Sequence, residues 1–144
     1  MPIRNARADD ESGIARLLKE LDYPGTESFL KDKIHLIIHH PSSRLIVYEK
    51  AQQVIAFMAI DIIVQLGLKG DFARISYFAV DSLYRGHGIG NEMENYCVSY
   101  AKEMNCERVE VHCHERRTAT HEFYIRQGYE EAPKYFIKEL NKVH

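Results

Sequence analysis

The chain has 144 residues, the length of one ordinary domain, with 45% hydrophobic and 28% charged residues, a balance typical of globular proteins. Its formal net charge of −2 at pH 7 gives no electrostatic reason to expect nucleic acid or an anionic membrane surface as a partner. The polar N-terminus lacks the apolar core of a signal peptide, and no segment approaches the ~20 apolar residues of a membrane helix. The cysteines, which are Cys97, Cys106 and Cys113, lack the spacing of paired motifs and favour reduced thiols. We therefore expect a single cytoplasmic domain over residues 1–144.

The first half of the chain is predicted to hold a short strand, two helices and an antiparallel meander of three strands. The N-cap candidates are Asp9 or Asp10 for the first helix and Thr26 for the second. The apolar faces at helical spacing are Ile14, Leu17, Leu18 and Leu21 in the first helix, and Leu30, Ile34, Ile37 and Ile38 in the second. Apolar, β-branched runs predict strands at 44–50, 54–65 and 71–81, with turns around 51–53 and at Gly67 and Gly70.

The second half of the chain changes to an alternation of strands and helices. A helix is predicted over 89–104, a strand over 108–114, a short helix that ends before Gly128, and a closing strand over 134–140. Joined to the meander, this order predicts an α/β (α+β) fold. We expect one mixed central sheet of about six to seven strands with about four helices on both faces.

Three glycines stand at every second position between a predicted strand and a predicted helix, in the stretch Arg85-Gly-His-Gly-Ile-Gly90. Glycine in a helix costs ~1 kcal/mol against alanine, so its use here needs a reason. Without a Cβ the backbone can approach a ligand closely, and the first N–H groups of a helix attract anions. Neither the Walker loop nor the dinucleotide motif fits the spacing. A pyrophosphate site is one interpretation, and a glycine-rich turn without a ligand is the other.

Two motifs together resemble the GNAT superfamily of acetyl-CoA-dependent N-acetyltransferases. The glycine stretch matches the family's [QR]-x-x-G-x-[GA] loop, and Phe123-Tyr124-Ile-Arg-Gln-Gly128-Tyr129 matches F-Y-x-x-x-G-[FY]. The order of predicted elements also matches that fold across nearly the whole chain. The first and last stretches are similar to the short single-domain branch that includes aminoalkylphosphonate N-acetyltransferases.

The resemblance implies that acetyl-CoA is the co-substrate and that a loop and a strand bind it. Its pyrophosphate would lie on Arg85, Gly86, His87, Gly88, Ile89 and Gly90. The backbone of Phe78, Ala79 and Val80 would pair with the pantetheine arm, as a peptide adds to a sheet edge. The thioester would lie where the predicted strands at 71–81 and 108–114 splay apart. Tyr77 and Tyr23 are the candidates to line the acceptor site, and the alternative for Tyr77 is a packed side chain.

The implied activity is transfer of the acetyl group to an amine. A small primary amine is the first expectation and a protein N-terminus the second. Two alternatives are a coenzyme A-binding module without catalysis and a partner-binding domain whose glycines form only a turn. The first of these follows from Ser76, which stands where many family members carry a glutamate; a hydroxyl cannot do the work of that carboxylate.

The resemblance also assigns catalytic roles. Tyr124 matches the family tyrosine that faces the coenzyme sulfur, and a phenol of ordinary pKa ~10 can protonate a thiolate. The alternative for Tyr124 is a packed aromatic side chain at a helix end. His114 is the candidate base in place of the missing glutamate, and its alternative is a solvated histidine at a strand end.

No metal is expected, because His112, His114 and His121 have no carboxylate at a defined spacing. His39 and His40 fit a helix C-terminus better than a metal site. A homodimer is expected from the family and from the apolar strand at 134–140, since exposed sheet edges invite pairing.

Overall fold

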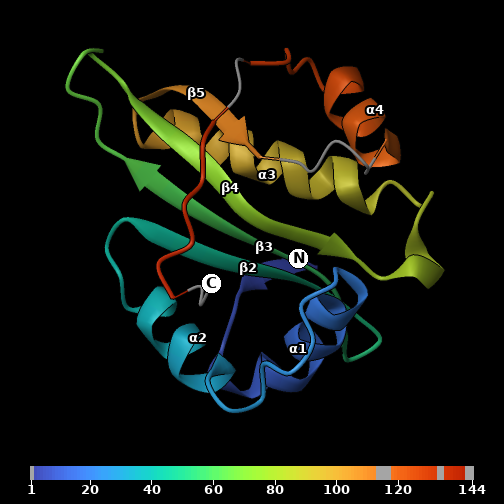
Figure 1. The fold of residues 1–144 in the computed structure, drawn as a ribbon. Coiled ribbons are helices and arrows are strands. Elements are labelled where there is room, and N and C mark those ends of the chain that lie inside the picture. Colours follow the sequence, from blue (N-terminus) through green and yellow to red (C-terminus); the bar gives the residue numbers. More distant parts are fainter. Residues whose placement is uncertain (1, 113–117, 133–134, 142–144) are drawn as a thin grey trace. The chain divides into compact units, whose positions relative to one another are not determined.

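A computed structural model describes residues 2–112, 118–132 and 135–141 of the chain. The chain divides into two units, Met1–His112 and Cys113–His144, each with its own internal contacts. The first unit carries the sheet and the helices α1, α2 and α3, and the second carries α4 (Figure 1). The predicted α+β class is confirmed, whereas the single domain over 1–144 stays a prediction.

The first unit is built on a mixed sheet whose strands follow one another in chain order. The strands are β1 (Ile3–Asn5), β2 (Ser43–Lys50), β3 (Gln53–Ile63), β4 (Asp71–Val80) and β5 (Cys106–Val111). β1 to β4 pair in antiparallel fashion, and β5 runs parallel to β4. The predicted meander is confirmed, and the parallel strand at its edge makes the sheet mixed.

The strand count is lower than predicted, because the described part of the chain holds a five-stranded sheet. Residues 135–140, the described part of the predicted closing strand, form no strand. Their apolar side chains are exposed instead, 96% for Phe136 and 88% for Leu140. A β-prone run becomes a strand only where its N–H and C=O groups meet a partner strand, and these residues have no ladder among the described ones.

Helices cover the sheet on both of its faces. α1 (Glu11–Glu20) and α2 (Leu30–Ile38) lie on one face and α3 (Ile89–Glu103) on the other (Figure 1). The apolar faces predicted for α1 and α2 pack against one buried cluster with side chains of β2, β3 and β4, including Val47, Phe57 and Ala79. Side chains alternate along a strand, so fully buried Ile46 and Met58 face the α3 side.

Asp10 takes the predicted N-cap position of α1, whereas the N-cap residue of α2 is Phe29 rather than Thr26. Asp10 stands directly before α1 but makes no side-chain cap bond to it. Its carboxylate accepts instead from the Arg4 guanidinium at 2.8 and 2.9 Å and from the Arg7 N–H at 2.7 Å. α2 begins at Leu30, later than expected, because the Thr26 carbonyl accepts from the N–H groups of Phe29 and Leu30 and holds a separate turn.

Two connections are decided by backbone conformation. Ala51 and Gln52 both have positive φ, 50° and 62°, and join the paired residues Lys50 and Gln53. This is the two-residue turn that suits the twist of a hairpin, as the sequence predicted. At Gly70 a Cβ would lie 2.9 Å from the Asn105 carbonyl oxygen and would overlap the Glu107 side chain. Only glycine therefore lets β4 begin this close to the start of β5.

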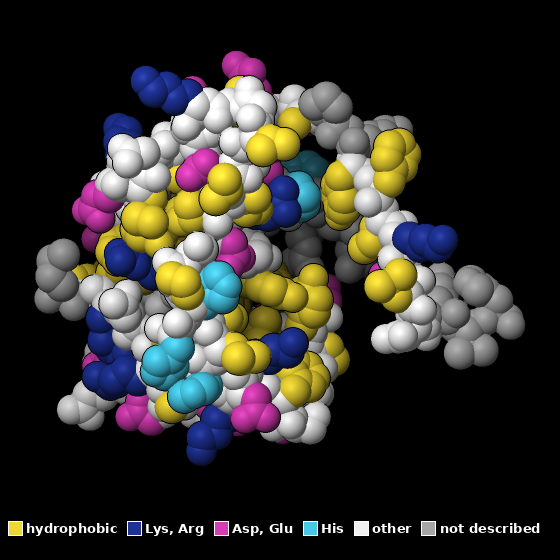
Figure 2. Space-filling model, turned by 90° about the vertical axis from the view of Figure 1, so that its left-hand side faces the viewer, with side chains coloured by type: hydrophobic (Ala, Val, Ile, Leu, Met, Phe, Trp, Pro, Cys, Tyr) yellow, Lys and Arg dark blue, Asp and Glu magenta, His cyan; other side chains and the backbone are white. Residues whose placement is uncertain are grey.

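The described helices include none long and apolar enough to cross a membrane. Hydrophobic side chains are nevertheless exposed on the face seen in Figure 2. The β3–β4 connection contributes exposed apolar side chains in the first unit, 78% for Val64 and 105% for Leu66.

Candidate functional site

β4 runs on beyond the end of its parallel neighbour. The β4–β5 ladder ends at the pair Ile75 and Val111, while β4 continues to Val80 and stays paired with β3. The splay predicted between the two strands is consistent with this early end of the ladder. β5 is shorter at its end than the predicted strand over 108–114, and His114 lies outside the described residues.

A β-bulge lies beside the end of this ladder. Tyr77 pairs with Ala59 and Ile75 pairs with Ile60, so Ser76 is the extra residue between two regular pairs. Its hydroxyl donates to the Ala59 carbonyl oxygen at 3.3 Å. A bulge bends a strand and re-aims its backbone, and bulges are frequent next to active sites. The residue at the family's glutamate position is thus the bulge residue itself, with its hydroxyl bonded across to β3.

The two residues predicted to line the acceptor site lie together. The Tyr23 and Tyr77 rings meet edge to face with centroids 5.4 Å apart, and the two residues remain 48% and 39% exposed. Tyr77 shares a face with its partner Ala59, which belongs to the core cluster under α1 and α2. Burial, and then the nearby Tyr23, raise the pKa of Tyr77. Its phenol is therefore neutral at physiological pH, and the pair forms a partly exposed aromatic wall.

The glycine stretch forms a loop between a short 3-10 helix and α3. The 3-10 helix η2 covers Ser82–Tyr84, and α3 begins at Ile89 with Gly88 as its N-cap. Gly86 and Gly88 have φ of 83° and 82°, and a Cβ on either would meet no atom within 4 Å. The left-handed backbone is thus the immediate reason for these two glycines, and the space in front of them is open.

The start of α3 offers donors to an anion. The first bond of its regular pattern runs from the Glu92 N–H to the Gly88 carbonyl oxygen at 3.1 Å. Helix geometry therefore leaves the N–H groups of Ile89, Gly90 and Asn91 without an acceptor inside the helix, where the helix dipole is positive. The Ile89 side chain is buried and fixes the helix end, whereas Arg85, Gly86, His87 and Gly88 are exposed. Loop and helix end together can hold a pyrophosphate.

The predicted pantetheine residues form the end of β4. Ala79 is buried, and Phe78 and Val80 are half-buried. All three pair with β3, in the order Met58, Phe57 and Ala56. They lie in the part of β4 that has passed the end of the β5 ladder. A ligand that extends along this part of β4 would meet strand backbone on one side, as an added strand does.

Tyr124 belongs to the second unit, in α4 (Thr118–Arg126). Its ring packs edge to face against Phe123 and Tyr129, with centroids 5.2 Å away in each case. Its carbonyl oxygen accepts from the Tyr129 N–H at 3.0 Å, and Gly128 has a φ of 93°. This is a glycine-terminated helix end of the Schellman type, so the predicted C′ glycine is confirmed.

Sequence reasoning missed two residues next to the loop. Asp81 is buried directly after β4 and pairs with Arg16 of α1, the distance from Arg16 Nη1 to Asp81 Oδ2 being 2.6 Å. An aspartate just before a short helical turn was a signal that could have found Asp81. Nothing in the spacing of α1 marked Arg16, because the contact joins residues far apart in the chain.

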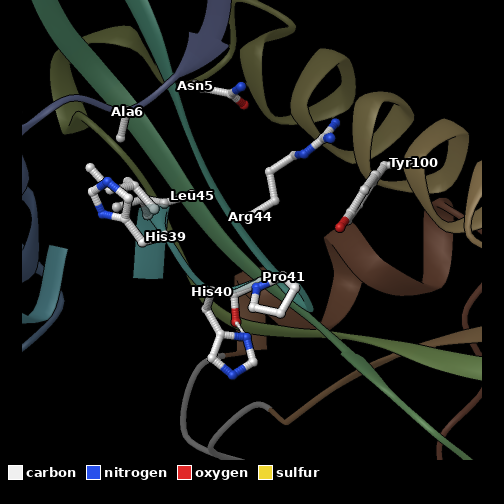
Figure 3. Close-up of a pocket in the computed structure, with 10 residues that line it drawn as sticks. Asn5, Ala6, His39, His40, Pro41, Arg44, Leu45 and Tyr100 are labelled. Atoms are coloured by element: carbon white, nitrogen blue, oxygen red, sulfur yellow. Dashed lines mark hydrogen bonds between the residues drawn. The ribbon is translucent and has the colours of Figure 1, made fainter. Parts of the chain in front are cut away.

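A pocket of about 450 Å³ lies elsewhere, at the β1–β2 edge of the sheet (Figure 3). Arg44 lines this pocket, and its guanidinium donates to the Tyr96 hydroxyl at 3.0 Å and lies 4.0 Å from the Tyr100 ring centre. On the α2 side, His39 bonds through Nδ1 to the His35 carbonyl oxygen at 2.9 Å, as expected for a histidine at a helix end. The strand order separates this edge from β4 by β3.

Histidine, cysteine and carboxylate side chains form no group that could hold a metal ion in the described part of the chain. The proposed base His114 cannot be placed, since it falls within the residues left undescribed.

The features of the first unit define a class of protein. A mixed sheet with a strand that passes its parallel neighbour, a bulge beside that point and a glycine loop before a helix define an α+β domain whose loop has the geometry to accept an anion. The chain belongs to the acetyltransferase (GNAT) family, whose sequence model matches residues 12–129. It is therefore an N-acetyltransferase by family, as both motifs predicted. The narrower aminoalkylphosphonate branch stays a prediction.

Solved structures share the fold at low sequence identity. A transcriptional regulator from Bacillus halodurans C-125 is 18% identical with a TM-score of 0.87, over 96% of this chain and 98% of that one. A GNAT family acetyltransferase from Staphylococcus aureus is 22% identical with a TM-score of 0.81, over 97% and 100%. Glucosamine-6-phosphate N-acetyltransferase from Arabidopsis thaliana is 21% identical with a TM-score of 0.83, over 96% and 97%. No curated protein sequence matches the chain.

Proposed function

We propose that this protein transfers the acetyl group of acetyl-CoA directly to a small primary amine. The observation that carries the proposal is the loop at the start of α3, where left-handed glycines, open space and unpaired helix N–H groups come together. One structural neighbour is named for acetylating glucosamine-6-phosphate, a small molecule. Family membership supports acetyl-CoA as the donor.

The residues present fit the coenzyme. The pyrophosphate would accept hydrogen bonds from the first N–H groups of α3 and a charge-assisted bond from Arg85. Left-handed Gly86 and Gly88 leave the approach open, since no atom lies within 4 Å of a Cβ position at either. The pantetheine arm would extend along Phe78, Ala79 and Val80, past the end of the β5 ladder.

The reaction forms a C–N bond and breaks the C–S bond of the thioester. The amine nitrogen attacks the carbonyl carbon, and a backbone N–H in the last part of β4 would donate to the developing oxyanion. The amine loses a proton, and the departing thiolate gains one. Tyr124 is our candidate for that second proton transfer, because a neutral phenol can donate to a thiolate. Its position in the matching motif supports this role.

The group that removes the proton from the amine cannot be the family's usual carboxylate, because Ser76 stands in its place. The Ser76 hydroxyl bonds to the Ala59 carbonyl oxygen. We propose His114 as the base. If it acts so, the rate rises with pH through an inflection that His114→Ala removes. If instead the enzyme captures amine that is already neutral, the inflection follows the acceptor's own pKa in both proteins.

The acceptor would approach along the Tyr23–Tyr77 wall. The two rings are partly exposed on the α1–α2 face of the sheet, next to the bulge at Ser76. Aromatic faces suit the carbon skeleton of an amine and attract a cation that approaches them.

A thiol-release assay with acetyl-CoA and a panel of small amines tests the proposal, with peptides as a second panel. We expect coenzyme binding and release of thiol with at least one small amine. Turnover on peptides alone would make a protein N-terminus the acceptor. Binding without any turnover would leave a coenzyme A-binding module, which the serine at position 76 favours as the second candidate. No binding would leave a partner-binding domain.

A further inference from the structure

Asp81 is a buried charge at the entrance to the coenzyme loop. It is 4% exposed, and its carboxylate accepts from the Leu83 N–H at 2.9 Å and from Arg16 at 2.6 Å. The Leu83 bond, more than the nearby Arg16, holds the pKa of Asp81 below its ordinary value against the effect of burial. A buried carboxylate is stable only when it is paired and hydrogen-bonded in this way.

Arg16 ties this carboxylate to two other elements. Its Nη1 donates to Asp81 and its Nη2 donates to the Val54 carbonyl oxygen of β3 at 2.7 Å. The Asp81 N–H in turn donates to the Ile55 carbonyl oxygen at 2.8 Å. α1, β3 and the end of β4 are therefore joined at one point by charged and backbone bonds.

The contacts of Asp81 determine where the loop begins. The Tyr84 N–H donates to the Asp81 carbonyl oxygen at 2.9 Å, so the turn Ser82–Tyr84 starts on Asp81, and Arg85 follows it directly. A second contact from α1 supports the same turn, from the Ser82 hydroxyl to the Glu20 carboxylate at 2.9 Å. Beyond Arg85 come the two left-handed glycines, which give the loop little stiffness of their own.

We propose that Arg16 and Asp81 are positioning residues for the coenzyme loop. The pair sets the direction in which Arg85 and the glycines leave the sheet, and so the distance between the loop and the pyrophosphate. Neither side chain contacts the reacting atoms. The inference rests on the proposed function, because it concerns the site that would bind the pyrophosphate.

Two acetyl donors separate positioning from general structural damage. Acetyl-CoA carries the pyrophosphate, whereas S-acetylpantetheine has the same thioester and arm without it. In Arg16→Gln we expect KM for acetyl-CoA to rise about tenfold with little change in kcat, which is loss of binding rather than of chemistry. For S-acetylpantetheine, kcat/KM should stay within about twofold of wild type, since this donor does not reach the loop.

Asp81→Asn keeps an oxygen for the Leu83 N–H but removes the charge that faces Arg16. We expect KM for acetyl-CoA to rise and kcat/KM for S-acetylpantetheine to stay near wild type, as in Arg16→Gln. The double variant should be no worse than either single variant, because both changes break one interaction. Arg16→Lys should recover part of the acetyl-CoA affinity. Arg7→Gln is the control, since its pair with Asp9 is exposed and shares no residue with the contacts of Arg16 and Asp81.

Equal losses with both donors, or no loss with either, would overturn the inference while wild type still binds acetyl-CoA. If Arg16→Gln is too unstable to assay, Arg16→Lys and Asp81→Asn decide the question. Instability in these two variants as well would show a structural role and would overturn the inference. If wild-type protein binds no acetyl-CoA in a calorimetric titration, the proposed function fails first and the inference fails with it.

Discussion

At the scale of single residues, the site depends on backbone conformations that glycine adopts without strain. Gly86 and Gly88 are left-handed, and so is Gly25 in the connection between α1 and α2. None of these positions has an atom within 4 Å of a Cβ. A side chain at any of these positions is therefore opposed by backbone strain rather than by crowding. Comparison of a loop glycine with Gly25 thus separates an effect on ligand binding from an effect on folding.

Gly88→Ala is expected to lower the affinity for acetyl-CoA about tenfold or more, because the added methyl group occupies the space in front of the α3 N–H groups. The left-handed backbone should also cost about 1 kcal/mol of stability. Gly25→Ala is the matched control, since it carries a similar φ of 73° and should lose stability without losing affinity. Calorimetric titration of both variants checks this, and equal affinities would remove the loop from the site.

Tyr124→Phe is expected to lower kcat by ~10²–10⁴-fold with little change in coenzyme affinity, because general acids contribute about that much. Tyr129→Phe is a suitable control, since it removes a hydroxyl from the neighbouring ring of the same aromatic group. Steady-state kinetics on both variants distinguishes the roles. Similar rates in Tyr124→Phe and wild type would mean that the ring only packs.

At the scale of elements, close approaches and buried ion pairs position the strands. Gly70 allows β4 to start against the turn before β5, where the Asn105 carbonyl oxygen is 2.9 Å from a Cβ position. Asp10 holds β1 to the turn before α1 through Arg4. Both contacts lie between segments whose proximity the sequence alone does not reveal, and one substitution disrupts either of them.

Gly70→Ala should destabilise the first unit by about 1–3 kcal/mol, the usual cost of forcing an extra carbon into a packed site. The backbone oxygen of Asn105 cannot move aside without disturbing the turn before β5. Gly67→Ala in the same connection meets nothing within 4 Å and should change stability little. Denaturant unfolding measures both, and equal stabilities would show that this contact relaxes freely.

Asp10→Asn should lower stability at pH 7 by about 1–3 kcal/mol, because Arg4 and the Arg7 N–H lose a charged acceptor. Burial opposes ionisation of Asp10, but the bonds from Arg4 and Arg7 outweigh it and hold the pKa below its ordinary value. A carboxyl group whose pKa is lowered by folding stabilises the folded state at pH values above its unfolded pKa of ~3.9. This stabilisation is lost as the pH falls through the folded pKa. The difference from wild type should therefore shrink below about pH 4 in acid unfolding curves.

Asp9→Asn is the comparison for this pH series, since its pair with Arg7 is 3.3 Å long and exposed on both sides. Such pairs contribute little, and its stability should follow wild type at every pH. A constant gap between Asp10→Asn and wild type down to pH 2 would contradict the pKa direction.

The helices and the meander could be predicted from periodicity, because α1, α2 and β2 to β4 carry apolar residues that the core buries in that same pattern. The glycine loop was found by its spacing, since left-handed backbone favours one residue type. The bulge at Ser76 and the pairing of Arg16 with Asp81 could not be found, because both depend on register and on long-range contact, although the N-cap position of Asp81 was a signal for that residue by itself. The strand at 134–140 was wrongly predicted because an apolar run does not specify its partner.

At the scale of the whole molecule, the oligomeric state stays a prediction. We still expect a homodimer, now on the basis of exposed apolar side chains rather than a strand edge; Phe136 and Ile137 are 96% and 75% exposed. Phe136→Glu should then shift the protein to monomer, because a charge on an apolar contact opposes association. Sedimentation of wild type and variant measures this, and a wild-type monomer at high concentration would contradict it.

We propose that this chain moves an acetyl group from acetyl-CoA to an amine in one direct step. Acetyl-CoA labelled with carbon-13 in its acetyl group allows a single test by mass spectrometry with the amine accepted in the thiol-release panel. For direct transfer we expect one labelled acetyl group on the amine nitrogen for each coenzyme thiol released, and none on the protein. Released thiol without acetylated amine, or no release with any amine offered, would contradict it.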